Sequence, residues 1–172
     1  LGGLGHMAVK FAHAFGAHVT VLSQSLRKEA DARRMGADEV QATSDPETFK
    51  RLASRFDLII NTVSEGIDWN QYLGLLKLDG SMVQVGVPET AVPVAAFPLV
   101  LQRRSLSGSL IGGIRETQEM LDFCGQHKIV SDIEVIPIQQ VSEAYERVVK
   151  SDVRYRFVID LASLPPAQGG KA

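Results

Sequence analysis

Hydrophobic and polar positions follow first a helical and then a strand-like period at the start of this chain. Apolar residues recur at helical spacing over residues 7–15, and Gly16 follows where a left-handed residue would end a helix. The next segment, "HVTVLS" (18–23), is β-branched and apolar, which is typical of a strand buried in a parallel sheet. The first segments therefore predict a helix and then a strand, which together are the second half of a βαβ unit.

The same alternation continues through residue 111. Strands that alternate with helices in this way predict an α/β fold with a doubly wound parallel sheet. The expected helices span 27–35 (ended by Gly36), Asp45–Arg55 (with Pro46 in the first turn), and about 68–77 (capped by Asp68 and followed by a break at Gly80). The expected strands are "DEV" (38–40), "DLIINTV" (57–63), "SMVQVGV" (81–87) and "SLSGSLI" (105–111).

Composition and charge narrow the possible partners. Hydrophobic residues make up 45% of the 172 residues, charged residues make up 22%, and the net charge is −2. That balance is ordinary for a globular protein and argues against nucleic acid or an anionic membrane as a partner. No apolar run approaches the ~18 residues of a membrane span. Cys124 is the only cysteine, which excludes a disulfide framework and favours a reduced, cytoplasmic compartment.

The glycines before the first helix predict a phosphate-binding turn. Gly2 and Gly5 have the spacing of the second and third glycines of G-x-G-x-x-G, whose first glycine would lie one position before Leu1. Such glycines let the backbone approach a pyrophosphate, and the helix N-terminus offers it N–H groups and partial positive charge. The alternative is that these glycines serve only a turn. Two positions are open for His6, which would lie either near the pyrophosphate or in solvent.

The residues after the second strand favour NADP over NAD. In this fold an acid ~20 residues after the glycines holds the ribose hydroxyl of NAD, whereas a basic residue accommodates the phosphate of NADP. Here Ser23, Ser25, Arg27 and Lys28 occupy that place, and the first carboxylate is Glu29. Hydroxyls and cations suit a phosphate dianion. The alternative is a serine cap followed by a solvated basic turn, but cations at a helix start oppose its dipole.

The carboxyl ends of the later strands supply further candidate contacts, because ligands of doubly wound sheets bind beyond these ends. Each of these residues could equally belong to an ordinary loop. They are Thr62, Val85, Gly86 and Ser109.

Several motifs in order resemble one family. The segments "GGLGHMAVKFA", "GADEV", "DLIINTVS", "DGSMVQVGVP", "SLSGSLIGGIRETQEMLDFC" and "DVRYRFVID" are similar to the zinc-dependent medium-chain alcohol dehydrogenases, in particular the cinnamyl-alcohol-dehydrogenase type. The resemblance runs from Leu1 to about Leu161. It implies a Rossmann-type doubly wound parallel sheet that lacks its first strand, plus the C-terminal segment of a GroES-like catalytic domain.

The resemblance also implies roles for individual residues in binding NADP. Gln24 departs from the serine often found at its position, and Arg154 is a weaker alternative to Arg156. The implied pyrophosphate contacts are Gly2, Gly3, Leu4 and, through its guanidinium, Arg156. The implied 2′-phosphate contacts are Ser23, Ser25, Lys28 and, beside them, Arg27. The implied nicotinamide contacts are Val85, Gly86 and Val87, with Ser109 and Ile111 opposite them.

By the same resemblance, the zinc ligands and the first strand would lie upstream of Leu1. We therefore expect no catalytic and no metal-binding residue in this chain, and expect Cys124 and His127 to serve a helix end. The first strand is central in the order 3-2-1-4-5-6, so its two neighbours would each expose an edge. The expected units are an N-terminally truncated NADP-binding domain (1–112), a segment of the catalytic domain (113–162) and a disordered tail (163–172).

These features lead to one main functional hypothesis. The longer enzyme would transfer hydride between NADP(H) and a zinc-bound alcohol or aldehyde, and this chain alone would be inactive. The alternatives are a stand-alone NADP-binding module and a zinc-free reductase of the quinone or enoyl type. The resemblance also implies a homodimer formed through strands near "LSGSLI". The apolar run "VAAFPLVL" (94–101) fits such an interface, although a buried loop explains it equally well.

Overall fold

Parallel pairing runs through every sheet of the computed structural model, which describes residues 1–164. The α-helices are α1 (Gly3–Ala14), α2 (Glu29–Arg34), α3 (Pro46–Arg51), α4 (Trp69–Leu73), α5 (Ala96–Leu101), α6 (Ile114–His127) and α7 (Val141–Val149). The strands are β1 (Thr20–Ser23), β2 (Glu39–Ala42), β3 (Phe56–Asn61), β4 (Leu76–Gln84), β5 (Ser105–Gly108), β6 (Ile133–Pro137) and β7 (Arg156–Asp160). Short 3-10 turns, η1 (Leu26–Lys28), η2 (Ile138–Gln140) and η3 (Leu161–Ser163), complete the fold.

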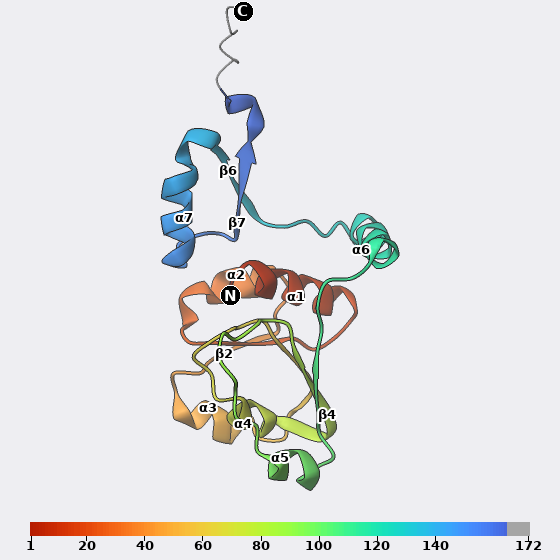
Figure 1. Cartoon of the computed structure of the whole chain (residues 1–172). Helices are drawn as coiled ribbons and strands as arrows, with labels where there is room; N and C mark the ends of the chain where they lie inside the picture. Colours follow the sequence, from red (N-terminus) through yellow and green to blue (C-terminus); the bar gives the residue numbers. More distant parts are fainter. Residues whose placement is uncertain (165–172) are drawn as a thin grey trace, which may run out of the picture.

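The Rossmann-like part is divided into two small sheets (Figure 1). β1 pairs with β2, and β3, β4 and β5 pair in that order. Within residues 1–164, no strand pairs with the second edge of β1 or of β3. Leu58 and Ile60 of β3 are 54% and 43% exposed, although apolar strands of this type are normally buried. The expected α/β fold that lacks a central strand is therefore confirmed.

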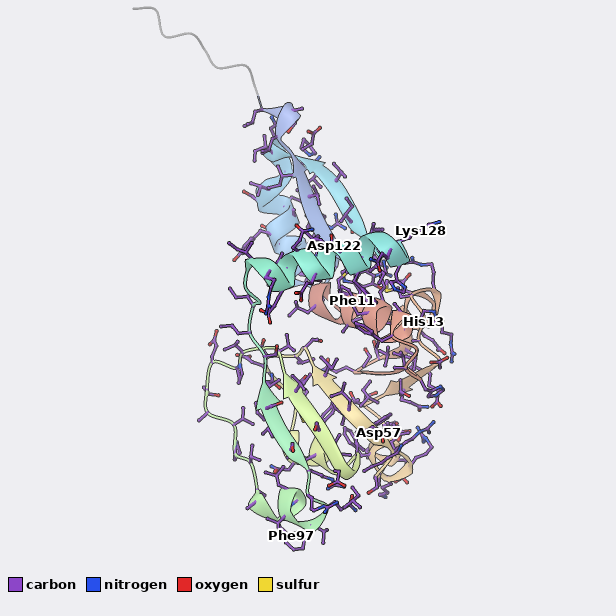
Figure 2. The ribbon with its side chains drawn as sticks, turned by 90° about the vertical axis from the view of Figure 1, so that its right-hand side faces the viewer. Phe11, His13, Asp57, Phe97, Asp122 and Lys128 are labelled. Carbon is purple, nitrogen blue, oxygen red and sulfur yellow. The ribbon has the colours of Figure 1, made fainter. Side chains whose placement is uncertain are left out.

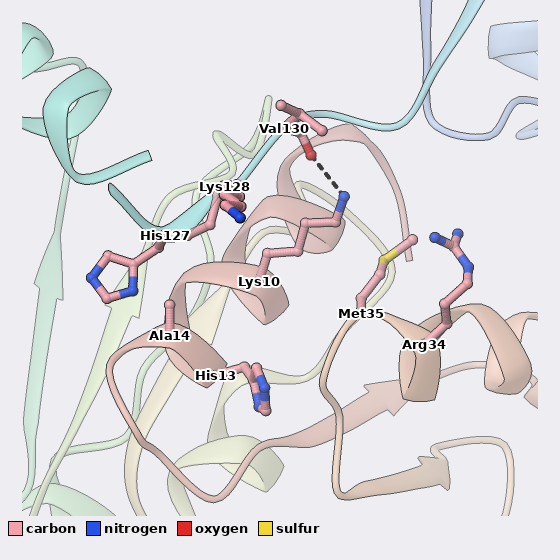
Figure 3. A pocket seen from close by; sticks show the side chains of 9 residues that line it. Lys10, His13, Ala14, Arg34, Met35, His127, Lys128 and Val130 are labelled. Carbon is pink, nitrogen blue, oxygen red and sulfur yellow. Dashed lines mark hydrogen bonds between the residues drawn. The ribbon is translucent and has the colours of Figure 1, made fainter. Parts of the chain in front are cut away.

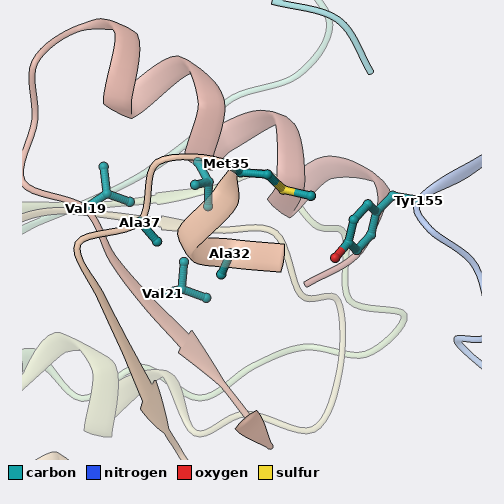
Figure 4. Packing of buried hydrophobic residues seen from close by; sticks show 7 residues of the cluster. Val19, Val21, Ala32, Met35, Ala37 and Tyr155 are labelled. Carbon is teal, nitrogen blue, oxygen red and sulfur yellow. The ribbon is translucent and has the colours of Figure 1, made fainter. Parts of the chain in front are cut away.

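Each small sheet has its own hydrophobic cluster. The first cluster lies between α1, β1 and α2 (Figure 4) and consists of Val9, Val19, Val21, Ala32, Met35, Ala37 and Tyr155. The second cluster lies around β3, β4 and α4 and consists of Leu52, Ile59, Leu73, Leu75, Leu76 and Met82. Leu22 of β1 packs against the second cluster and so joins the two.

The C-terminal part forms a separate layer at one end of the molecule (Figure 1). β6 and β7 pair in parallel, and α7 lies beside them with Ala144 buried. Apolar side chains on the outside of this unit stay exposed, among them Val135 at 64% and Val149 at 74%. α6 connects this unit to the rest and lies across α1 (Figure 2), where Phe123 stacks on Phe15 with 4.6 Å between ring centroids.

Capping side chains and glycines determine several helix ends that the sequence predicts. The carboxylates of Asp45 and Asp68 accept backbone N–H groups at 3.0 Å and cap α3 and α4, as expected. Gly16 and Gly36 end the helices before them with φ of 77° and 107°, a region that favours glycine.

Several predicted boundaries were wrong. The strands predicted at 81–87 and 105–111 end earlier, at Gln84 and Gly108. α3 ends at Arg51 and α4 at Leu73, both earlier than expected. Gly80 does not break a helix from a strand but lies inside β4, where the register with β3 shifts between Phe56 and Leu58. The irregular pairing explains why the sequence there does not look like a strand.

The predicted tail falls almost wholly outside the described residues. Residues 165–172 are not described, but Ser163 ends η3 and its Oγ accepts the N–H of Ile138 at 2.8 Å. No helix within residues 1–164 is long and apolar enough to cross a membrane.

Candidate functional site

The N-terminus of α1 presents an open set of donors. Gly2 occupies the N-cap and provides no side-chain cap, and the first amide bonded within the helix is that of His6, which donates to Gly2 O at 3.0 Å. The preceding amides of the first turn have no acceptor in the helix. A Cβ placed on Gly2 would meet no atom within 4 Å, so the N-cap residue is not enclosed by the rest of the described chain. Free amide groups at a helix N-terminus are the donors that bind anions.

Arg156 lies beside this turn, although it comes from the far end of the chain. Its Nη2 donates to Gly3 O at 3.4 Å. A Cβ on Gly3 would lie 3.6 Å from Tyr155 O and 3.8 Å from Arg156 Nε. The structure thus brings together the glycine turn and the arginine that the sequence predicts to contact the same phosphates. Leu4, which follows in the turn, is 49% exposed.

Thr62 also reaches the same turn. It follows the last residue of β3, and a Cβ added to Gly5 would lie 3.3 Å from its Oγ1. The small size of Gly5 therefore allows the end of β3 to approach the first turn of α1.

The predicted phosphate-binding residues gather at the end of β1. Ser23 is its last residue, and Ser25 is the N-cap of η1. Ser25 makes no side-chain cap hydrogen bond, so the alternative of a serine cap is wrong. Lys28 Nζ donates to Leu1 O at 3.0 Å, and burial lowers the pKa of this lysine. Arg27 in η1 is exposed.

The predicted nicotinamide residues follow β4 and β5. The N–H groups of Val85 and Gly86 both donate to Asn61 O, at 2.9 and 3.2 Å. A Cβ on Gly86 would lie 2.8 Å from the backbone of Val63, so this close approach requires glycine. Val87 is 71% exposed.

An open hollow of about 570 Å³ lies beside the end of β5. Ser109 and Ile111 both line it, together with Gly112 and Met120. Ile111 is nevertheless 89% exposed, so the side chain has little packed around it.

A second open pocket, of about 420 Å³, lies away from these residues, at the C-terminal end of α1 (Figure 3). Lys10, His13, Arg34, His127 and Lys128 are among its lining residues, whereas the predicted cofactor contacts are not. Lys10 Nζ donates to Val130 O at 2.7 Å and to Asp132 Oδ1 at 2.5 Å.

Sequence reasoning missed the buried partners behind the site. His6 is fully buried and stacks on Tyr155 with 4.9 Å between centroids, and its Nε2 lies 3.1 Å from Ser131 Oγ. Burial lowers the pKa of His6, so this ring is neutral at pH 7. The expectation of a solvated histidine was wrong. No local pattern marks Tyr155 as its partner.

Asn61 is the other buried polar residue that the sequence reasoning missed at the strand ends. Its Nδ2 donates to Gln84 Oε1 at 2.6 Å, and its Oδ1 accepts the N–H of Val63 at 3.0 Å. These bonds tie the end of β3 to the end of β4. The sequence signal was available, because Asn61 is the first polar residue after the apolar run 58–60.

Within residues 1–164, no group of three or more His, Cys, Asp or Glu side chains could hold a metal ion. Cys124 and His127 both lie in the last turns of α6. Cys124 O accepts the N–H of Ile129, and the His127 ring stacks on Phe123 at 4.2 Å.

Comparison with known proteins decides the family. Residues 3–126 match the family described as zinc-binding dehydrogenase. The chain belongs to this family. The NADP-dependent alcohol dehydrogenase C 1 of Mycolicibacterium smegmatis is 64% identical over 164 residues, which cover 95% of this chain and 47% of that protein. The mannitol dehydrogenase of Petroselinum crispum is 53% identical over 95% of this chain and 49% of its own length.

Two solved structures agree with the fold. A cinnamyl alcohol dehydrogenase from Sorghum bicolor superimposes with a TM-score of 0.90 at 46% identity, over 96% of this chain and 47% of that chain. The protein named CAD from Helicobacter pylori, in a complex with NADP(H), superimposes with a TM-score of 0.83 at 38% identity, over 94% of this chain and 46% of that chain. The predicted resemblance is confirmed. The chain spans about half the length of the curated relatives it matches.

Proposed function

We propose that this chain is the NADP-binding half of a zinc-dependent alcohol dehydrogenase or aldehyde reductase. The observation that carries the proposal is the open N-terminus of α1, with Lys28 and Arg156 beside it. The free amide groups at the N-terminus of α1, together with the cations Lys28 and Arg156, fit a pyrophosphate and a further phosphate. The names of two relatives that are 64% and 58% identical over 164 residues, both NADP-dependent alcohol dehydrogenases, support the same cofactor.

Each predicted contact then has a role in binding or orientation. The glycine turn and Arg156 would hold the pyrophosphate, and Ser23, Ser25, Arg27 and Lys28 would hold the 2′-phosphate. Thr62, Val85–Val87, Ser109 and Ile111 would orient the nicotinamide. When bound, NADPH supplies the hydride, and zinc in the longer protein supplies the Lewis acid.

The two alternative functions are not favoured. Relatives at 53–64% identity are named alcohol, formaldehyde or mannitol dehydrogenases, which argues against a zinc-free reductase. A stand-alone module would have to leave the apolar edges of β3 and the outer face of β6 and β7 exposed.

The units of the chain are also part of the proposal. We assign NADP binding to residues 1–112 and a segment of the catalytic domain to 113–162. The separate pairing of β6 with β7 supports this division. α6, which belongs to the second of these units, packs on the first, because Phe123 lies against Phe11 and Phe15 of α1.

A homodimer through the β5 side is a further part of the proposal, as is a cytoplasmic location. Leu110 beyond β5 is 83% exposed, and α5 exposes Phe97 and Val100 at 70% and 75%. The buried-loop interpretation of residues 94–101 is only partly right: residues 96–101 form helix α5, and Phe97, Val100 and Leu101 are exposed, whereas Val94 and Leu99 pack against the second cluster. Sedimentation of the wild type and of a Phe97→Asp variant would test the dimer, with dissociation expected for the variant.

Calorimetric titration of the purified chain with NADPH and then NADH tests the cofactor assignment. We expect tight binding of NADPH and much weaker binding of NADH. Failure to bind either cofactor would contradict the proposal that this chain forms the site. We also expect no turnover of alcohols by the chain after loading with zinc, and turnover would contradict the assignment of catalysis to the longer protein.

A further inference from the structure

Tyr155 links the C-terminal part of the chain to the proposed phosphate site. Among the described members of the first cluster, it alone comes from beyond Val40, and it is 3% exposed. Figure 4 shows it at the end of the cluster near Met35. Its ring stacks on His6, which follows the glycine turn, with an interplanar angle of 15°.

The hydroxyl of Tyr155 is hydrogen-bonded to Asp31, an acid close to the basic residues Arg27 and Lys28 in the sequence. It donates to Asp31 Oδ2 at 2.9 Å. Arg154 Nε lies 2.9 Å from the same oxygen, and Arg34 Nη2 lies 3.6 Å from Oδ1. The carboxylate of Asp31 is therefore turned toward partners other than Lys28. Its charge still acts on Lys28 and partly opposes the lowering of the lysine pKa, which is mainly due to burial.

Lys28 itself has only neutral partners at short range. Its Nζ donates to Leu1 O at 3.0 Å and to Ser151 O at 3.5 Å, and it lies 5.1 Å from the centroid of the Tyr155 ring. Among the ion pairs of residues 1–164, none includes Lys28. The ammonium is thus held in place by carbonyl oxygens and a ring face, and its charge is not neutralised by a carboxylate.

We propose that Tyr155 is a positioning residue that determines the preference for NADP over NAD. Its ring supports the Lys28 ammonium, and its hydroxyl holds Asp31 so that the carboxylate does not pair with Lys28. The positive charge of Lys28 then stays available for the 2′-phosphate. This inference rests on the proposed function, because it assigns a role within the same cofactor site.

A purely structural role would not require this chemistry. Packing in the first cluster needs only an apolar ring, whereas a buried tyrosine hydroxyl needs a hydrogen-bond partner. The partner that it takes is the carboxylate whose charge acts on Lys28. Both ends of the side chain therefore act on the same cation.

The test compares Tyr155→Phe and Tyr155→Leu with the wild type by calorimetric titration with NADPH and with NADH. The first variant removes only the hydroxyl, and the second also removes the ring. We expect the NADPH affinity to fall about threefold and about tenfold, respectively, while the NADH affinity stays within about twofold. Tyr145→Phe, at a tyrosine of α7 that is 73% exposed, is the matched control and should change neither affinity.

A double-mutant cycle with Lys28→Ala separates positioning from packing. In the Lys28→Ala background, both Tyr155 substitutions should leave the ratio of NADPH to NADH affinity unchanged, because the cation on which they act is absent. If the ratio still falls in that background, Tyr155 does not act through Lys28 and the proposal is wrong.

The outcomes also separate this inference from the proposed function. Wild-type chain that binds neither cofactor would overturn both. Wild-type chain that prefers NADPH, with variants that lose both affinities equally, would overturn only the role of Tyr155. Should Tyr155→Leu unfold, as judged by circular dichroism, the Tyr155→Phe variant carries the same test.

Discussion

At the phosphate end of the proposed cofactor site, contacts join residues that lie far apart in the sequence, whereas the nicotinamide end is mostly open. Lys28 contacts Leu1, Arg156 contacts Gly3, and Tyr155 stacks on His6. At the other end, Val87 and Ile111 are 71% and 89% exposed. This chain therefore assembles one end of the site by itself. Most of the binding free energy should come from the adenosine and phosphate half of the cofactor.

The largest expected effect is a difference between the two halves of NADP as separate ligands. We expect 2′-phospho-ADP-ribose to bind with an affinity within about tenfold of that of NADPH, because it keeps the phosphates. Nicotinamide mononucleotide should bind at least ~100-fold more weakly, since it meets the open end. Calorimetry measures both. Comparable affinities for the two halves would show that the ends do not differ.

A negative charge at the phosphate end should reverse the cofactor preference. In Ser25→Asp, a carboxylate would stand where the 2′-phosphate is expected, so we expect the NADPH affinity to fall about thirtyfold through repulsion and desolvation. The NADH affinity should stay the same or rise. Ser25→Ala is the control, with a loss of about threefold. Equal effects of the two variants would place the phosphate elsewhere.

The backbone at the nicotinamide end makes a close approach at Gly86, and a glycine substitution tests it. In Gly86→Ala, the new Cβ would lie 2.8 Å from the Val63 backbone, so we expect a loss of about 1.5 kcal/mol in the free energy of unfolding. Gly125→Ala in α6 is the matched control. Its Cβ would meet no atom within 4 Å, and it should stabilise the helix by up to ~1 kcal/mol. Urea denaturation measures both, and equal stability of the two variants would contradict the close approach.

The smallest expected effect concerns the acid that ties the C-terminal part to α1 and α2. Hydrogen bonds from Lys10 and from Arg34 lower the pKa of Asp132. The pKa of Asp132 in the folded state therefore lies below the unfolded value of about 3.9. The stability that this carboxylate contributes is complete above that pH and is lost as the pH falls through the folded pKa. We expect Asp132→Asn to lose about 1 kcal/mol in the free energy of unfolding at pH 7, and to show a flatter decline of that free energy as the pH falls below about 4.

Asp57→Asn provides the comparison for that pH experiment. Asp57 pairs with Lys77 at 2.8 Å, but its side chain is 83% exposed, so the pair is screened by water. Its substitution should lower the free energy of unfolding at pH 7 by less than about 0.5 kcal/mol. Two identical pH profiles for the variants would show that Asp132 makes no special contribution.

The sequence was most informative where local chemistry decides the structure. Gly2 before a helix, Asp45 and Asp68 as caps, and Gly36 with its positive φ all follow from the needs of a few neighbouring residues. Serines and cations after β1 likewise predicted a phosphate site, because a βα turn fixes where they lie.

The features that the sequence did not predict depend on contacts between distant segments. His6 shows no local sign that it would be buried against Tyr155, and a tyrosine in "DVRYRF" shows no sign that it would reach Asp31. The end of α4 was misjudged because the helical pattern continues past Leu76, where β4 begins to pair with β3. α3 ends earlier than its pattern because the chain turns before β3, with Ser54 in a left-handed conformation (φ 52°). Tertiary packing overrides such local preferences.

The interruption between β1 and β3 also has a consequence for how the molecule unfolds. The two hydrophobic clusters share no hydrogen-bonded ladder, and the side chain of Leu22 is one of the few bridges between them. Cooperativity depends on such shared structure, so each cluster can open by itself. Amide hydrogen exchange in this chain should therefore proceed in two blocks with separate rates, one for β1 and β2 and another for β3, β4 and β5.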